Sequence, residues 1–478
     1  MQTMHRAIQL ANSYRLAWHL ALFLLFAAIL SACGGGSKDA TTPTTPAPSL
    51  VSITISPANP TISLGLTQQF TASGSYSDGS SAAITKDLVW SAPGTVASIV
   101  QTTGVATSKA IGSETITATV GKITSTTKLN VQAPYVGIAA GGSHSLILKA
   151  NGSLLSTGLN RTGQLGNGTA NDQADLLQLG TVSTWTLVAA GEFHTVALRS
   201  DASLWTWGFN QNGQLGDASF VDKLNPTKIG SGTWSAIAAG KSHTLAVKKD
   251  GTLWAWGRNF NGQLGDGTVI DRIEPVQIGT AKNWTTVTAG ASHSIARRAD
   301  GTIWGWGNNS NGQVGVGPSL TVLSPTQIGT ATWVSISAGQ NHSLGIRADG
   351  ALFTWGGNDA GQLGNGALSD RLNPSQIGTQ TTWALVSAGS KHSLALKTDG
   401  SLWSWGLNVD GQLGLGDTLN QLAPIQIGDA KNWKAVSAGQ FHTLGIKTDG
   451  TLWIWGRNIE GQLGNGKRTN LAVPTPLL

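Results

Sequence analysis

Seven histidines share the first pattern in this sequence that suggests chemistry. They recur at intervals of 49 or 50 residues, at His144, His194, His243, His293, His342, His392 and His442. Imidazole can bind metals and move protons near neutral pH. A metal site needs several ligands around one ion, and none of the seven has an Asp or Cys companion at ligand spacing. We therefore expect partly buried structural histidines, with ring nitrogens bonded to the backbone of a neighbouring strand or repeat.

Three other repeated features are better explained by structure than by catalysis. The Gly-Gln-Leu-Gly segments lack the Lys-Ser/Thr of a phosphate-binding loop, and pairs such as Trp254 and Trp256 favour packing between repeats over a carbohydrate platform. Turn residues that precede a glycine, or Ala202 in one copy, favour hairpin turns over acid–base groups; they are Asn151, Asp201, Asp250, Asp300, Asp349, Asp399 and Asp449. Because no nucleophile–base pair stands out, we expect no enzyme, no cofactor and no metal.

The elements that carry these residues form a repeat, which is the sign of a solenoid, propeller or array. One copy predicts a strand over 383–389, a second over 392–397, a two-residue hairpin turn at Asp399-Gly400, a third strand over 401–406 and a last one over 424–428. Seven such sets cannot form one open sheet, whereas radial repetition removes the long sheet edges.

The repeat, with its Ala-Gly-x-x-His-Ser and Trp-Gly-x-Asn…Gly-Gln-Leu-Gly elements, resembles that of the regulator of chromosome condensation family. The resemblance covers residues 135–478 and implies an all-β fold, a seven-bladed β-propeller. We further expect the first strand, 135–140, and the last, 473–478, to meet and complete one blade.

Residues 50–132 predict a separate β-sandwich with Trp90 in its core, because short alternating runs are divided by Gly, Pro and Ser-Asp-Gly turns. Their order resembles the bacterial Ig-like domain of group 2. That resemblance implies a cell-surface module, which is a stalk in many members and adhesive in some. We favour the stalk.

The amino terminus has the pattern of an export signal. Residues 1–15 carry Arg6 and Arg15 and no acid, and 16–30 are apolar. The following Leu30-Ser31-Ala32-Cys33 resembles a bacterial lipobox. This implies a signal peptide over 1–32, lipidation of Cys33, a flexible linker over 33–49, and attachment to the outer membrane or cell surface. The alternatives are a secretory signal with an incidental cysteine, or a short anchor helix.

Charge excludes one class of partner. The chain has 30 basic and 24 acidic residues. Without Arg6 and Arg15 the balance is 28 to 24, or +4. This small excess is spread evenly along the chain, which argues against nucleic acid.

The positions that differ between copies are the candidate binding residues. They follow Ala-Gly or flank the Asn after Trp-Gly, and antiparallel order places both sets on one face of the ring. A rigid frame with varied loops is typical of binding proteins. The candidates for partner binding are Phe193, Phe209, Lys241, Arg258, Phe260, Lys391, Phe441 and Arg457.

We expect a lipid-anchored extracytoplasmic binding or scaffold protein with a protein or glycan partner. The family resemblance also implies guanine-nucleotide exchange as an alternative. Exposed tryptophans would suit a glycan adhesin, and drift between duplicated copies would explain the varied positions without any function.

Overall fold

The computed structural model describes residues 47–477, and these residues form strands, turns and bends without a helix. The expected signal peptide, Cys33 and most of the linker lie outside the described residues. Within 47–477, no helix is both long and apolar enough to cross a membrane.

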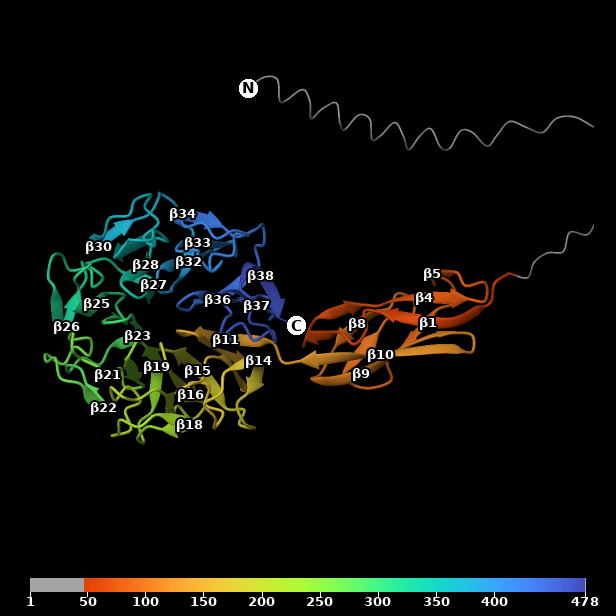
Figure 1. Ribbon diagram of the computed structural model, residues 1–478, viewed down its shortest axis with the longest axis horizontal. Helices are drawn as coiled ribbons and strands as arrows, with labels where there is room; N and C mark the ends of the chain where they lie inside the picture. Colours follow the sequence, from red (N-terminus) through yellow and green to blue (C-terminus); the bar gives the residue numbers. More distant parts are fainter. Residues whose placement is uncertain (1–46, 478) are drawn as a thin grey trace, which may run out of the picture. The chain divides into compact units, whose positions relative to one another are not determined.

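Residues 50–132 form an all-β body of three sheets around one core (Figure 1). The first sheet has the order β1 (Leu50–Ser56), β4 (Thr71–Tyr76), β5 (Ser81–Ala83). The second has β2 (Thr61–Ser63), β10 (Ile123–Gln132), β9 (Gly112–Val120), β6 (Val89–Ser91). The third has β3 (Thr67–Gln69), β8 (Val105–Ser108), β7 (Ala97–Ile99). Trp90 is 1% exposed and packs near Phe70 in the core, which confirms it as the core aromatic residue.

From Tyr135 onwards the chain forms seven four-stranded antiparallel sheets, each made of consecutive strands. We call these sheets blades 1 to 7. Blades 1 to 3 comprise β11 (Tyr135–Ala140), β12 (His144–Lys149), β13 (Leu154–Gly158) and β14 (Gln173–Gln178); β15 (Trp185–Ala190), β16 (His194–Arg199), β17 (Leu204–Gly208) and β18 (Lys223–Lys228); and β19 (Trp234–Ala239), β20 (His243–Lys248), β21 (Leu253–Gly257) and β22 (Arg272–Gln277).

Blades 4 to 7 repeat the same order around the ring (Figure 1). They comprise β23 (Trp284–Ala289), β24 (His293–Arg298), β25 (Ile303–Asn308) and β26 (Thr321–Gln327); β27 (Trp333–Ala338), β28 (His342–Arg347), β29 (Leu352–Gly356) and β30 (Arg371–Gln376); β31 (Trp383–Ala388), β32 (His392–Lys397), β33 (Leu402–Gly406) and β34 (Gln421–Gln426); and β35 (Trp433–Ala438), β36 (His442–Lys447), β37 (Leu452–Gly456) and β38 (Leu471–Leu477).

The ends of the repeat region do not complete one blade, so that prediction was wrong. β11 is the innermost strand of blade 1, and β38 is the outermost strand of blade 7. Tyr135 occupies the strand position that a Trp holds in the other copies, paired with Lys149 as Trp234 is with Lys248, so blade 1 is complete by itself. The ring closes because β11 packs beside β35 and β36, with Gln440 donating its backbone N–H to the carbonyl of Gly141 at 3.0 Å.

The tryptophans lie between blades, as their alternation with small residues predicted. Trp256 is fully buried against Val196, Leu204 and Ile229 of blade 2, and its indole N–H donates to the backbone carbonyl of Gln214 at 2.9 Å. Trp254 is only half-buried, but the Nζ of Lys248 lies 3.6 Å from its ring centroid. A cation covers the equivalent ring in blades 2 to 7, which leaves that aromatic face without room for a sugar.

The Asp-Gly hairpins are longer than the expected two-residue turns. The backbone N–H of Lys248 donates to the carbonyl of Thr252, which leaves a three-residue loop of Lys249, Asp250 and Gly251. The carboxylate of Asp250 accepts the backbone N–H of Thr252 at 3.0 Å and its hydroxyl at 2.6 Å. Gly251 has φ +80°, the left-handed position of a three-residue hairpin. The aspartates are therefore turn residues, as predicted, in a different turn.

Candidate binding face and the histidine ring beneath it

The seven histidines form a ring of inter-blade hydrogen bonds, each from Nε2 to a Ser or Thr hydroxyl of the next blade. The pairs are His144–Thr195 (3.2 Å), His194–Thr244 (3.0 Å), His243–Ser294 (2.9 Å), His293–Ser343 (2.9 Å), His342–Ser393 (3.0 Å), His392–Thr443 (3.3 Å) and His442–Ser145 (2.9 Å). The last pair joins blade 7 to blade 1, so the chain of contacts is closed.

The hydroxyl partners determine the tautomer of these rings. Ser294 donates its single hydroxyl proton to the backbone carbonyl of Gln263 at 2.7 Å, so the hydroxyl must accept from Nε2–H of His243. Nδ1 of His243 is then an acceptor without a partner. The expectation that both ring nitrogens bond to backbone was therefore wrong: one bonds a hydroxyl and the other bonds nothing.

Burial keeps the histidines neutral. All seven are 0% exposed. Burial lowers the pKa of His144 to about 4 and that of the other six to about 3, from the usual 6.5. Among residues 47–477, no group of three or more His, Cys, Asp or Glu could hold a metal ion. The seven neutral histidines therefore join neighbouring blades through uncharged hydrogen bonds.

The Ala-Gly segments line a cavity of about 120 Å³ on the ring axis, and the residue after each Gly also lines it.

Glycine is required beside each histidine. A Cβ on Gly240 would lie 2.4 Å from Cε1 of His243 and 2.6 Å from the carbonyl oxygen of Gly290. The close approach of backbone and imidazole therefore sets the distance between neighbouring blades at the axis.

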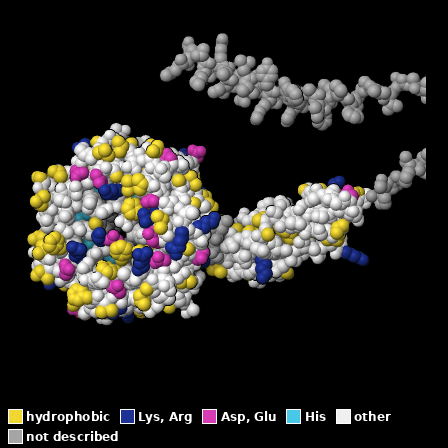
Figure 2. Space-filling model, in the orientation of Figure 1, with side chains coloured by type: hydrophobic (Ala, Val, Ile, Leu, Met, Phe, Trp, Pro, Cys, Tyr) yellow, Lys and Arg dark blue, Asp and Glu magenta, His cyan; other side chains and the backbone are white. Residues whose placement is uncertain are grey.

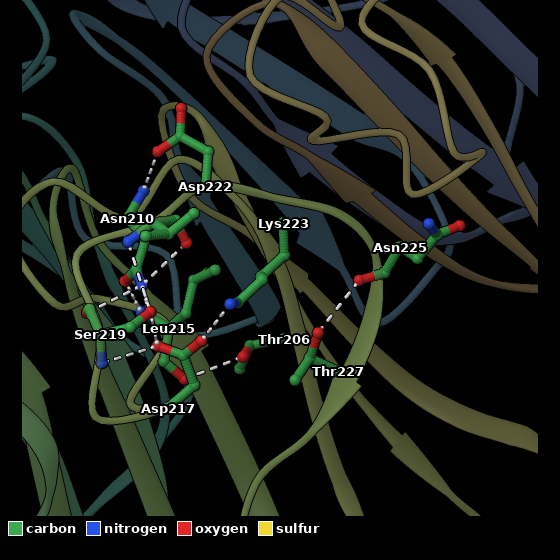
Figure 3. Close-up of polar contacts among 10 residues, drawn as sticks. Thr206, Asn210, Leu215, Asp217, Ser219, Asp222, Lys223, Asn225 and Thr227 are labelled. Carbon is green, nitrogen blue, oxygen red and sulfur yellow. Dashed lines mark hydrogen bonds and ion pairs between the residues drawn. The ribbon is translucent and has the colours of Figure 1, made fainter.

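The Asn after Trp-Gly, which the sequence analysis treated only as a marker, anchors the loop before the outer strand. Nδ2 of Asn210 donates to Oδ1 of Asp217 (2.9 Å) and to the carbonyls of Ser219 (2.9 Å) and Val221 (3.2 Å) (Figure 3). Its Oδ1 accepts the N–H of Leu215 at 2.9 Å. The side-chain amide thus bonds oxygens of the loop and the backbone of the corner, which holds the two together.

The two sets of varied positions do lie on one face. The first residue after each Trp-Gly donates its backbone N–H to the carbonyl of the residue before the histidine, as in Phe209 to Phe193 (2.8 Å) and Arg457 to Phe441 (2.9 Å). We call this end of the propeller the variable face. Loop residues just before the outer strands belong to the same end, because Gly208 and Lys223 are paired across β17 and β18.

The structure brings four of the eight candidates into two pairs close to the axis. Phe193 and Phe209 make an edge contact with centroids 6.3 Å apart, and the guanidinium of Arg457 lies 5.8 Å from the ring of Phe441. These pairs belong to blades 2 and 7, on either side of blade 1. We call these four residues the aromatic set.

The other four candidates are spread over blades 3 and 6. Lys241 is exposed and lies 3.3 Å from Glu192, while Arg258 and Phe260 are exposed, Phe260 by 70%. Lys391 is paired with Asp359. Burial alone would raise the pKa of Asp359, but hydrogen bonds from Lys391 and Gln362 outweigh it and bring the pKa below its usual value. Lys391 therefore belongs to a local ion pair away from the aromatic set.

Two residues of this face were missed by sequence reasoning. Glu460 and Asp410 flank Arg457 at 3.3 and 4.0 Å. Each occupies a position that varies between copies, so their variation was a usable signal, but their pairing depends on which blades are neighbours. Figure 2 shows charged side chains near the middle of the propeller and hydrophobic ones around its edge.

Comparison with family models accounts for most of the chain. The model described as RCC1-like domain matches residues 80–387, well over half of the chain, and the model for the regulator of chromosome condensation (RCC1) repeat matches 399–446 and 449–478. The first match begins before β11, within the preceding all-β body.

Solved structures with a similar fold include yeast RCC1 (Prp20) and human WBSCR16. Prp20p from Saccharomyces cerevisiae is 23% identical, with a TM-score of 0.63, over 69% of this chain and 86% of that one. Human WBSCR16 is 22% identical, with a TM-score of 0.61, over 68% and 89%. These identities show the fold alone.

A curated relative, Ice-binding protein 1 of Shewanella frigidimarina, is 38% identical over 105 residues. The match spans 22% of this chain and only 12% of that protein, so the shared stretch is a small part of the relative. The RCC1-like match, the seven repeated sheets and the similar propellers agree with one another, and the chain belongs to the family of proteins with an RCC1-like domain.

Proposed function

We propose that this protein is a non-enzymatic, lipid-anchored extracytoplasmic binding protein whose variable face engages a protein partner. The observation that carries the proposal is the aromatic set: half-buried Phe and Arg side chains at varied positions, held by backbone hydrogen bonds that every blade repeats. Aromatic and Arg residues are the types that dominate binding energy in protein interfaces.

The remaining parts of the chain fit that role. Residues 50–132, with their three sheets and Trp90 core, would serve as an Ig-like stalk. Lipidation at Cys33 would attach the chain to the outer membrane or cell surface, as the lipobox resemblance implies. Family membership supports protein binding as the general role of the propeller, because Prp20p was solved with a description of its binding to Gsp1p and histones.

Two alternatives have less support. Guanine-nucleotide exchange would need an insertion that reaches a nucleotide site, whereas the seven blades here have closely similar loops. Glycan binding through the Trp pairs is opposed by the Lys or Arg that covers the outer Trp ring in five blades. Ice binding is not carried over from a relative that this chain matches over 12% of its length.

The test is cross-linking in intact cells followed by identification of captured proteins, repeated with the double variant Phe193→Ala, Phe441→Ala. We expect the specifically captured protein to fall by about tenfold or more, since hot-spot truncations cost about 2 kcal/mol or more each. Val334→Ala is the control, because Val334 is 54% exposed and follows Trp333, which pairs with Arg347 at the end of β27 opposite the variable face. Equal capture by the double variant and the control would contradict the assignment of this face.

A further inference from the structure

The strongest pattern outside the aromatic set is a row of exposed apolar side chains at one repeat position. In blades 2 to 6, the fourth or fifth residue after the Gly-Gln-Leu-Gly-type corner is a large apolar residue exposed by 52 to 73%. We call these residues the rim tips: Phe220, Val221, Val269, Ile270, Leu320, Leu368 and Leu419. Single exposed apolar residues are common on protein surfaces, but recurrence at one repeat position in five consecutive blades distinguishes these from scattered ones.

Because the repeat is regular, the rim tips lie at the same level along the propeller axis. Each tip belongs to the loop that the buried Asn holds before the outer strand, as Nδ2 of Asn259 holds the carbonyls of Thr268 (3.0 Å) and Ile270 (3.2 Å). Because every blade repeats this anchor, five consecutive loops present their apolar apices in an arc on the rim of the variable face. Figure 2 shows hydrophobic side chains in separate groups around the edge of the propeller.

Three carboxylates beside the tips of blades 2 and 3 each have a partner within the protein. Asp217 and Asp266 form ion pairs with Lys223 (3.0 Å) and Arg272 (2.7 Å). Asp271 accepts the backbone N–H of Asn259 at 2.7 Å. When these loop apices leave water, each of the three carboxylates therefore keeps its partner. A retained partner lowers the free-energy cost of burying a carboxylate in an apolar medium.

We propose that the rim tips insert into the interfacial region of a phospholipid bilayer. Separate apices spread over five blades suit a planar, continuous medium better than a protein partner, whose binding energy concentrates in a compact cluster. Blade 7 carries exposed Arg468 at the corresponding position, with exposed Lys467 directly before it, and these cations are complementary to lipid phosphates. A partner of the aromatic set would then meet this protein at the membrane surface.

The experiment places an environment-sensitive fluorophore on single cysteines in the full-length chain, with Cys33→Ser to remove the native thiol. The labelled positions are Val269→Cys, Leu320→Cys and Leu419→Cys. The controls are Asp300→Cys, on an exposed hairpin at the opposite end of the propeller, and Val51→Cys, which is 61% exposed in the 50–132 body. Vesicles of phosphatidylcholine and phosphatidylglycerol are added, with and without lipids that carry a quencher in the acyl chain.

We expect a blue shift, a severalfold rise in emission and quenching by the acyl-chain quencher at the three tips, and none at the two controls. Val269→Ser with Ile270→Ser should reduce the response at position 320 and leave the melting temperature unchanged, since both side chains are exposed. Unchanged emission at the tips of vesicle-bound protein, or an equal shift at position 300, would overturn the proposal. So would a shift without vesicles accompanied by a doubled mass, which would indicate self-association. Co-flotation of protein that retains Cys33 tests the N-terminal anchor separately, because Val269→Ser with Ile270→Ser removes tips and leaves that anchor unchanged.

Discussion

At the scale of single residues, the seven histidines are structural, because the repeat places each imidazole in the contact between two blades. Each imidazole is fully buried, neutral, and bonded through Nε2 to a hydroxyl whose own proton is committed to a backbone carbonyl. A ring nitrogen without a partner remains, but it lies against backbone and behind a glycine. Such a group contributes to stability through its neutral form and has no access to substrate.

This arrangement predicts a pH dependence of stability. The histidine pKa is about 3 in the folded state and near 6.5 in the unfolded state, so the unfolded chain binds more protons below pH 6.5. The stabilisation is fully present above pH 6.5 and is lost as pH falls towards 3, by about 1.4 kcal/mol per pH unit for each histidine. Between pH 6.5 and 5 the carboxylates contribute little, because their usual pKa values lie near 4.

The measurement is denaturant unfolding of the wild type and His243→Asn at pH 7, 6 and 5. The variant should be less stable at pH 7, and its deficit should shrink below pH 6.5 by about 1.4 kcal/mol per unit, because one buried titrating group is gone. A deficit that stays constant between pH 6.5 and 5 would show that the folded-state pKa is not lowered.

At the scale of elements, each blade is a strand set whose ends are held by local polar contacts. Asp250 organises the three-residue hairpin between β20 and β21, and Asn259 organises the corner after β21. The strands and their order could be predicted from alternation and turn residues. The hairpin length could not be predicted, because the same sequence fits a three-residue loop of Lys249, Asp250 and Gly251 or a two-residue loop of Asp250 and Gly251. The choice between them depends on a contact with the next blade, where the backbone N–H of Trp284 donates to the carbonyl of Gly251.

The hairpin glycine gives a second prediction. Gly251→Ala should destabilise the propeller by about 2 kcal/mol or more, because an L-residue at φ +80° is strained and its Cβ would lie 2.1 Å from the carbonyl oxygen of Lys282. Gly230→Ala is the matched control: it has φ +55° but no atom within 4 Å of the added Cβ, so only the conformational cost of about 1 kcal/mol applies. Thermal and denaturant unfolding check both variants, and equal losses would argue against the steric contact.

At the scale of the whole molecule, the ring closes by the same contacts that join any two neighbouring blades. His442 and Ser145 are 297 positions apart in sequence, yet their bond has the length of the His243–Ser294 bond, 2.9 Å in each case. Both serines also donate to a Gln carbonyl at 2.7 Å. No strand is shared between the ends of the repeat region, so side-chain contacts and packing of β11 against β35 and β36 hold the junction.

Equivalent junctions should respond equally to mutation. Ser145→Ala and Ser294→Ala each remove a hydroxyl that links an imidazole to a carbonyl, which leaves two buried groups unpaired and costs about 1–3 kcal/mol. We expect the two free energies of unfolding to agree within about 0.5 kcal/mol. A negligible effect of Ser145→Ala beside a large effect of Ser294→Ala would mean that the blade 7–blade 1 junction does not carry the stability of the ring.

The amino-acid sequence by itself determined the all-β class, the repeat, the core role of Trp90 and the side of the ring on which the varied residues lie. These follow from local periodicity, because alternation sets the strand faces and antiparallel order sets the direction of each loop. Only the tertiary structure decided that blade 1 alone separates Phe441 and Arg457 from Phe193 and Phe209, that Lys391 is paired with Asp359, and that the terminal strands belong to separate blades. The physical reason is that ring closure brings the first and last repeats into contact, and no local pattern in a linear chain encodes how its two ends meet.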